Sequence, residues 1–149
     1  MFDVLPGQGL VLPRRAGVLR FGMSEQECQW AVSTLADVRG TWVCQAGWAF
    51  TARYEGVDLL AYGDCPDRLG RIDQDVPGLA TVLLSRYQSG PSGATGPSAV
   101  PVVLHDVDLF GYPVGEVLAA LEPGAPAGVE WVPTRSPSGY LSEVRLSRG

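Results

Sequence analysis

Two stretches of the sequence share one pattern of hydrophobic and polar positions. LRFGMSEQECQWAVSTL begins at Leu19, and DLFGYPVGEVLAAL begins at Asp108. In each, an apolar strand end runs into Phe-Gly, a turn or cap residue stands two positions after the glycine, and a glutamate follows three residues later. We interpret the pattern as a structural repeat in which a strand leads into a helix.

Each copy predicts a short helix with one apolar face. In the first, Ser24 and Glu27 fit a capping box, and the helix should end near Gly40. In the second, Pro113 is tolerated in a first helical turn, and Pro123 should end the helix. The apolar residues at i, i+3, i+4 and i+7 are Cys28, Ala31, Val32 and Leu35 in the first copy, and Val114, Val117, Leu118 and Leu121 in the second.

The segments WAFTARY and VDLLAYG predict a β-hairpin, because Glu55-Gly56 between them suits a two-residue turn. If Tyr54 pairs with Val57, Arg53 lies opposite Asp58. Seven side chains then share one apolar face: Trp48, Phe50, Ala52, Tyr54, Val57, Leu59 and Ala61. We expect a core in which Trp48, Phe50, Tyr54, Leu59 and Ile72 pack against Val32 and Leu35.

Further strands are expected on both sides of this hairpin. TWVCQ precedes it, and a turn at residues 64–67 leads into LGRIDQDV after it. LATVLLSRY and AVPVVLHDVDLF read as strands on either side of QSGPSGATGPS, a surface loop or linker with nothing to bury. GVEWV and YLSEVRLS are two more candidate strands around a turn-rich segment.

The order of elements is therefore helix then strands, twice. We predict an α+β fold in which two abbreviated helix-plus-antiparallel-sheet repeats share one core. The chain of 149 residues fits a single domain, 1–149, with pseudo-repeats at about 17–78 and 100–149 and the Gly/Ser/Pro loop at 88–98.

The charge balance narrows the class of partner. The chain has 16 acidic residues, 11 basic residues and a formal net charge of −5. An acidic surface repels nucleic-acid backbones and anionic membranes, whereas it attracts a basic protein. No apolar run suits a signal peptide or a membrane span, so we expect a soluble, cytoplasmic protein with no membrane or nucleic-acid partner.

Few residues suggest catalysis. Cys28, Cys44 and Cys65 lack metal-site spacing and indicate reduced thiols, and no P-loop or complete dinucleotide fingerprint occurs, so we expect no metal and no cofactor. His105 is the single histidine, and alternation would place it on a strand beside Asp106. The enzyme alternative is a small hydrolase that uses His105 with Asp106 or Asp108 as acid/base groups.

The second face of the predicted hairpin sheet carries an unusual mixture. It would place three apolar side chains inside a rim of alternating charges, which is the anatomy of a binding face. The alternative is that the second repeat or the long loop covers it. The candidate partner-binding residues are Arg53, Asp58, Leu60, Tyr62, Leu69, Arg71 and Asp73.

The run FGMSEQEC resembles the G-M-[S/T]-x-x-[E/Q]-[V] helix start of the helix-plus-sheet repeats in SmpA/OmlA-type bacterial lipoproteins and in the β-lactamase-inhibitor protein, which has two in tandem. The longer run PGQGLVLPRRAGVLRFGMSEQE is similar to the opening of small uncharacterised bacterial proteins, immunity-type proteins among them. The resemblance covers about twenty residues closely. It implies a repeat fold and, for the immunity type, protection against a toxin.

These observations favour a non-catalytic, cytoplasmic protein-binding module, most concretely an inhibitor or toxin-immunity protein with a basic protein partner. A small hydrolase and a structural or assembly module are the alternatives. The pattern leaves the oligomeric state open.

Overall fold

A computed structural model describes residues 1–44, 46–63, 78–86, 100–121, 124–132 and 139–148. In these residues two β-sheets and two α-helices combine into a mixed α+β fold, as the sequence predicts. Several predicted features lie outside the described residues: the turn at 64–67, the strand LGRIDQDV with Ile72, and the loop at 88–98.

The first sheet has five strands in the spatial order β3-β2-β1-β8-β9. Its strands are β1 (Phe2–Leu5), β2 (Gly9–Val11), β3 (Val18–Arg20), β8 (Val102–Leu104) and β9 (Val107–Asp108). All neighbouring pairs are antiparallel except β1 and β8, which run parallel and pair Phe2 with Val102. A short 3₁₀ helix, Pro13–Arg15, lies between β2 and β3.

The second sheet has six strands in the spatial order β10-β11-β7-β6-β5-β4, all antiparallel. Its strands are β4 (Arg39–Gly40), β5 (Trp48–Tyr54), β6 (Val57–Gly63), β7 (Leu79–Arg86), β10 (Val129–Val132) and β11 (Glu143–Ser147). The two helices are α1 (Glu25–Ser33) and α2 (Val114–Ala120).

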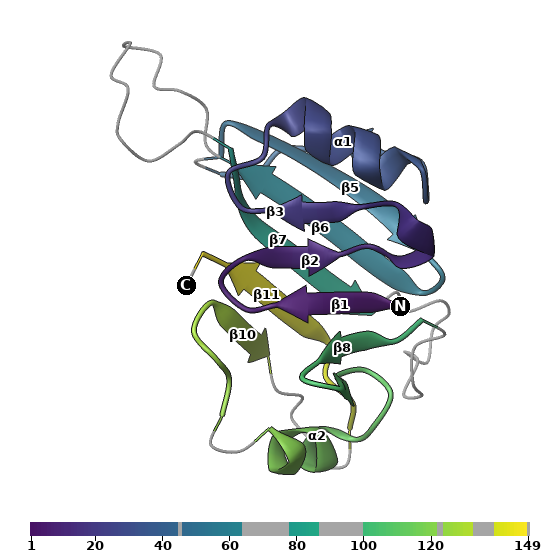
Figure 1. The fold of residues 1–149 in the computed structure, drawn as a ribbon, viewed down its shortest axis with the longest axis vertical. Helices are drawn as coiled ribbons and strands as arrows, with labels where there is room; N and C mark the ends of the chain where they lie inside the picture. The colour runs from purple at the N-terminus through teal and green to yellow at the C-terminus, as the bar shows by residue number, and fades with distance from the viewer. Residues whose placement is uncertain (45, 64–77, 87–99, 122–123, 133–138, 149) are drawn as a thin grey trace.

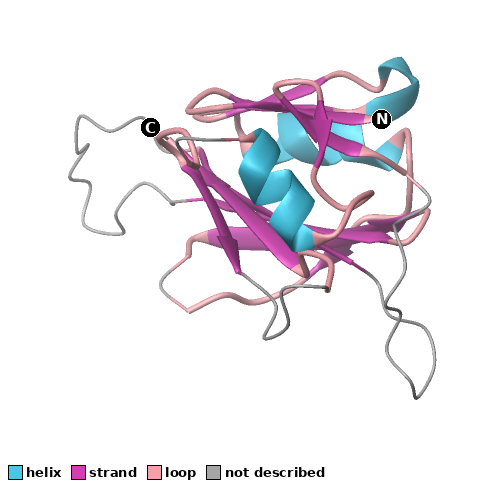
Figure 2. Cartoon of the chain, turned by 90° about the horizontal axis from the view of Figure 1, so that it is seen from below, coloured by secondary structure: helices cyan, strands magenta, loops and turns pink. Residues whose placement is uncertain are grey.

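The two sheets form two layers, as Figure 1 and Figure 2 show. Helix α1 contacts both β3 and β5 and so bridges one edge of the layers, while α2 contacts β9 at the opposite end of the molecule. Between the layers the buried residues make one hydrophobic cluster that draws on both sheets and both helices. Across the layers the ring of Phe2 meets Tyr54 edge-on, with centroids 6.1 Å apart.

The predicted hairpin is confirmed in its register. Tyr54 pairs with Val57 and Arg53 pairs with Asp58, and burial alternates along β6. The inward face joins the core as expected: Phe50, Leu59 and Val32 are buried in the cluster, and Trp48, Tyr54 and Leu35 pack against it. Two-residue alternation therefore identified the correct face of this hairpin.

The predicted start of the first helix is confirmed, and its predicted end is wrong. The Ser24 side chain accepts a hydrogen bond from the Glu27 amide, and the Glu27 carboxylate accepts one from the Ser24 amide. The helix ends at Ser33, well before Gly40, with Thr34 as the C-cap. Leu35 reaches the core from the turn that follows, where its amide donates to the Val32 carbonyl.

In the second helix Val114, Val117 and Leu121 are buried, whereas Leu118 is 37 % exposed. The expected apolar face is therefore narrower than its spacing indicates. Pro113 stands at the N-cap of the seven-residue helix, and Leu121 is its C-cap.

Two predicted strands are wrong in their extent. Residues 41–44 of TWVCQ are not a strand; the chain pairs with β5 through Arg39 and Gly40 instead. AVPVVLHDVDLF is not one strand either, because it folds back on itself after Leu104, which pairs with Val107. The pattern predicted only the end of β3, and it missed β1 and β2. In β2, Gly9 packs so closely on β3 that a Cβ would collide with the Leu19 carbonyl.

The two copies of the sequence pattern occupy corresponding places. β3 and β9 are the opposite edge strands of the first sheet, and each leads through a helix to an edge strand of the second sheet, β4 or β10. The repeat itself stays a prediction.

Candidate protein-binding face

The outer face of the six-stranded sheet is the side opposite to the five-stranded sheet. No helix or other strand among the described residues lies over it (Figure 2). The cross-strand register aligns six side chains in one row over all six strands, which we call the central row. The central row is Arg39, Thr51, Leu60, Leu83, Arg145 and Glu130.

A second row runs beside it and consists of Arg53, Asp58, Ser85 and Glu143. Because directly paired residues in an antiparallel sheet point to the same face, the two rows form one surface. Leu60 and Leu83 are half-buried at its middle, and charged side chains stand toward its edges.

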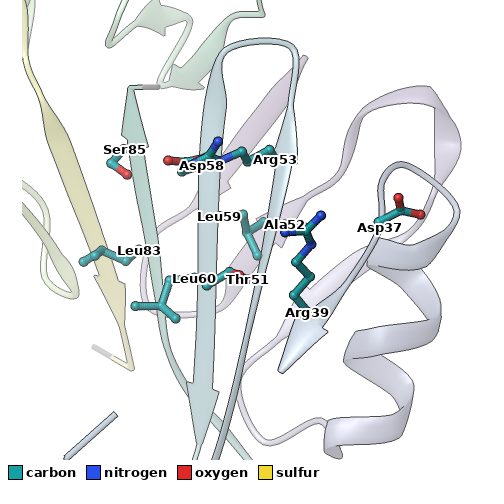
Figure 3. A pocket seen from close by; sticks show the side chains of 10 residues that line it. All are labelled: Asp37, Arg39, Thr51, Ala52, Arg53, Asp58, Leu59, Leu60, Leu83 and Ser85. Atoms are coloured by element: carbon teal, nitrogen blue, oxygen red, sulfur yellow. The ribbon is translucent and has the colours of Figure 1, made fainter. Parts of the chain in front are cut away.

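Two half-open grooves cross this surface and meet at Leu60 and Leu83. The first has a volume of about 580 Å³ (Figure 3). It is lined by Asp37, Arg39, Thr51, Ala52, Arg53, Asp58, Leu59, Leu60, Leu83 and Ser85. The second has a volume of about 390 Å³ and is lined by Val43, Leu60, Tyr62, Leu83, Glu130, Trp131, Glu143 and Arg145. Each groove therefore combines an apolar floor with charged walls.

The predicted pair of Arg53 and Asp58 forms an ion pair, with 3.0 Å between Arg53 Nε and Asp58 Oδ1. The side chains are 68 % and 34 % exposed, so the pair contributes at most about 1 kcal/mol to stability. Asp58 Oδ1 is itself shielded from solvent and makes no hydrogen bond within the described residues.

The Tyr62 hydroxyl accepts a hydrogen bond of 3.1 Å from Arg145 Nη2. The two residues lie on β6 and β11, which are separated by β7, so the arginine side chain reaches across a strand. Tyr62 is half-buried, and its ring lines the second groove. The interaction holds a cation and an aromatic ring at the centre of the face.

Four of the predicted site residues therefore lie together: Arg53, Asp58, Leu60 and Tyr62. Leu69, Arg71 and Asp73 lie outside the described residues. The contributions of β4, β7, β10 and β11 to this face were not predicted. LATVLLSRY and YLSEVRLS were predicted as strands, but nothing in their sequences indicates that these distant strands are neighbours.

The hydrolase candidates lie elsewhere, in the turn between β8 and β9. The expectation that His105 lies on a strand is wrong: His105 and Asp106 have φ of 49° and 66° and form the turn itself. Within the described residues His105 makes no hydrogen bond or ion pair. Asp108 Oδ1 accepts from the Phe110 amide at 3.2 Å, which fixes the chain after β9.

The described residues contain neither a membrane-spanning helix nor a metal-ligand cluster. None of their helices is long and apolar enough to cross a membrane. No group of three or more His, Cys, Asp or Glu side chains among them could hold a metal ion.

Comparisons with protein-family models, with curated proteins and with solved structures find no match for this chain.

Proposed function

We propose that this protein is a non-catalytic protein-binding module whose outer face covers a basic protein partner. In its most concrete form it is a cytoplasmic inhibitor or toxin-immunity protein. One observation carries the proposal: a sheet face with a leucine pair at its centre, two grooves and a charged rim, over which no described helix or strand lies. Apolar centres inside polar rims are the common anatomy of protein interfaces.

The charges of the grooves support a cationic partner. Four carboxylates line them, on Asp37, Asp58, Glu130 and Glu143, against three guanidinium groups. Two of those guanidinium groups already interact within the chain, Arg53 with Asp58 and Arg145 with Tyr62. The chain as a whole carries a net charge of −5, which favours the approach of a positive surface.

An exposed tryptophan beside the second groove adds an anchor. Trp42 is 80 % exposed, and the next residue, Val43, lines the groove with Tyr62. Tryptophan and tyrosine are enriched among the residues that dominate binding energy. Trp42 and Tyr62 are therefore the side chains expected to contribute most to the interface.

The hydrolase alternative has weaker support. His105 and Asp106 are consecutive turn residues, and Asp108 bonds to the backbone next to it. A general base needs a partner that orients it and a reacting group within reach. An activity screen on esters, phosphoesters and glycosides, followed by His105→Ala, distinguishes the two proposals, because turnover lost in that variant would favour the hydrolase.

A photo-cross-linking experiment tests the binding function directly. The benzophenone amino acid p-benzoylphenylalanine replaces Tyr62 on the outer face or, as a matched control, Tyr112, which is 54 % exposed and lines neither groove. Irradiation in the native host should give an adduct with a basic protein from position 62 and none with it from position 112. Equal adducts from both positions, or none from position 62, would contradict the proposal.

A further inference from the structure

The order of charges along the central row makes the outer face complementary to itself. Arg39 lies at one end and Glu130 at the other, with Leu60 and Leu83 in the middle. The row therefore reads positive, polar, apolar, apolar, positive, negative. A face with opposite charges at its two ends fits a second copy that is turned end for end.

The symmetry can be worked out from the register. In a face-to-face dimer with a twofold axis parallel to the strands and above the β6–β7 pair, β4 of one copy lies over β10 of the other, and β5 lies over β11. Arg39 then faces Glu130 of the second copy, and Leu60 faces Leu83. The axis produces each contact twice.

The charges of the second row are also complementary between two copies related by this axis. Under the same axis Arg53 of one copy faces Glu143 of the other, and Asp58 faces Ser85. By contrast, an axis along the central row would place Arg39, Arg145 and Glu130 each against the same residue of the second copy, which costs energy.

We infer that the protein forms a homodimer through this face, with Arg39–Glu130 and Arg53–Glu143 pairs between copies and the leucine pair at its centre. The inference rests on the proposed function, because the second copy covers the partner-binding face until a basic partner displaces it. Aligned packing of two sheets is a common arrangement.

The size of the face sets the strength of this dimer. Five spacings of about 4.8 Å between six strands make a width of about 24 Å, and the longer strands run for about 20 Å. Two copies would bury on the order of 1,000 Å², which is at the low end for specific interfaces. The dimer therefore dissociates on dilution and leaves the face free for its partner.

Charge reversal tests the geometry. Sedimentation velocity on the full chain over a wide concentration range should show a monomer–dimer equilibrium. Arg39→Glu and Glu130→Arg should each weaken self-association about tenfold or more, because each creates two like-charge contacts. Both residues are exposed, so the variants should keep the fold. The matched controls Arg20→Glu and Glu116→Arg, exposed residues that line neither groove, should leave dimerisation unchanged.

Mixing the two variants gives the decisive result. The Arg39→Glu chain and the Glu130→Arg chain each repel themselves, but together they restore opposite charges at both ends, so a heterodimer should form. A monomer at every concentration, a dimer that ignores both reversals, or a mixture that stays monomeric would overturn the inference.

The cross-linking experiment separates this inference from the proposed function. A monomeric protein that still gives the foreign adduct from position 62 overturns the dimer and leaves the function standing. A charge-dependent dimer whose only adduct from position 62 has twice the mass of the chain supports the dimer and overturns the function.

Discussion

Phe50 shows how much one core side chain contributes to the stability of this fold. It has no exposed surface, and its ring stacks on Trp48 with centroids 5.9 Å apart and planes inclined by 8°. Phe50→Ala should lower the free energy of unfolding by about 3–5 kcal/mol, because it leaves a cavity between the layers. Urea denaturation measures the loss. Thr51→Ala, the next residue on the outer face, serves as control and should cost under about 1 kcal/mol; a similar value for Phe50→Ala would contradict the assigned face.

Under the proposed function, Tyr62 would contribute to binding in two ways, through its ring and through its hydroxyl. Tyr62→Ala should weaken the complex with the captured partner by about 2 kcal/mol or more while the unfolding midpoint stays unchanged. Tyr62→Phe keeps the ring and removes only the acceptor for Arg145, so its effect should be smaller. Surface binding kinetics provide the measurement. Equal affinity for all three proteins would exclude the ring as an anchor.

Cys28 gives the protein a pH dependence in the alkaline range. Burial, and secondarily the charges of Glu27 and Glu25, raise the pKa of its thiol from 9.0 to about 12. Between these values the unfolded chain loses the proton and the folded chain keeps it, so stability should fall as pH rises from 9 toward 12. Cys28→Ala should flatten this part of the profile in urea denaturation.

The same thiol can be tested chemically. Because the thiolate is the reactive form, iodoacetamide should modify exposed Cys44 quickly and Cys28 only after unfolding. A Cys44→Ser, Cys65→Ser protein isolates Cys28. Rapid modification of that protein in its folded state would show that the site is accessible.

At the level of elements, the turn between β8 and β9 is strained. His105 and Asp106 both have positive φ, a conformation that favours glycine or asparagine. Asp106→Gly should therefore raise the free energy of unfolding by about 0.5–1 kcal/mol. The other tight turn supplies the opposite control, since Gly56→Ala at a φ of 86° should destabilise. Thermal denaturation measures both, and a destabilised Asp106→Gly variant would mean that its side chain is needed.

The elements that the sequence predicted well have local causes. The β5–β6 hairpin follows from alternation around a two-residue turn, and the start of α1 follows from the Ser24–Glu27 capping box. Ends were harder to predict. The apolar spacing that includes Leu35 suggested a longer helix, but the Leu35 side chain reaches the core from the turn after α1. Strands of two or three residues such as β4 and β2 are too short to show a period.

At the scale of the whole molecule, the binding face could be predicted only in part. The hairpin supplied Leu60 and Tyr62 because both lie on one strand that pairs locally. Leu83, Arg145 and Glu130 reach the face through pairings between strands that are distant in the sequence. No periodicity within a strand specifies its neighbour, so the central row became visible only with the topology.

Those distant pairings also determine how the chain folds. β1 and β8 pair in parallel and align Phe2 with Val102, and β7 pairs with β11 in the six-stranded sheet. The chain loses conformational entropy when it closes loops over such separations, and it does so before the stabilising contacts between the strands form. Refolding from urea should therefore be slow, on a scale of milliseconds to seconds. An early intermediate should contain the β5–β6–β7 meander before β1 pairs with β8 and before β11 pairs with β7. Pulsed hydrogen exchange would reveal that order through early protection of Leu59 and late protection of Val144. Until the last strands join, both sheets present open edges, and the nascent protein is exposed to aggregation for longer than its modest size suggests.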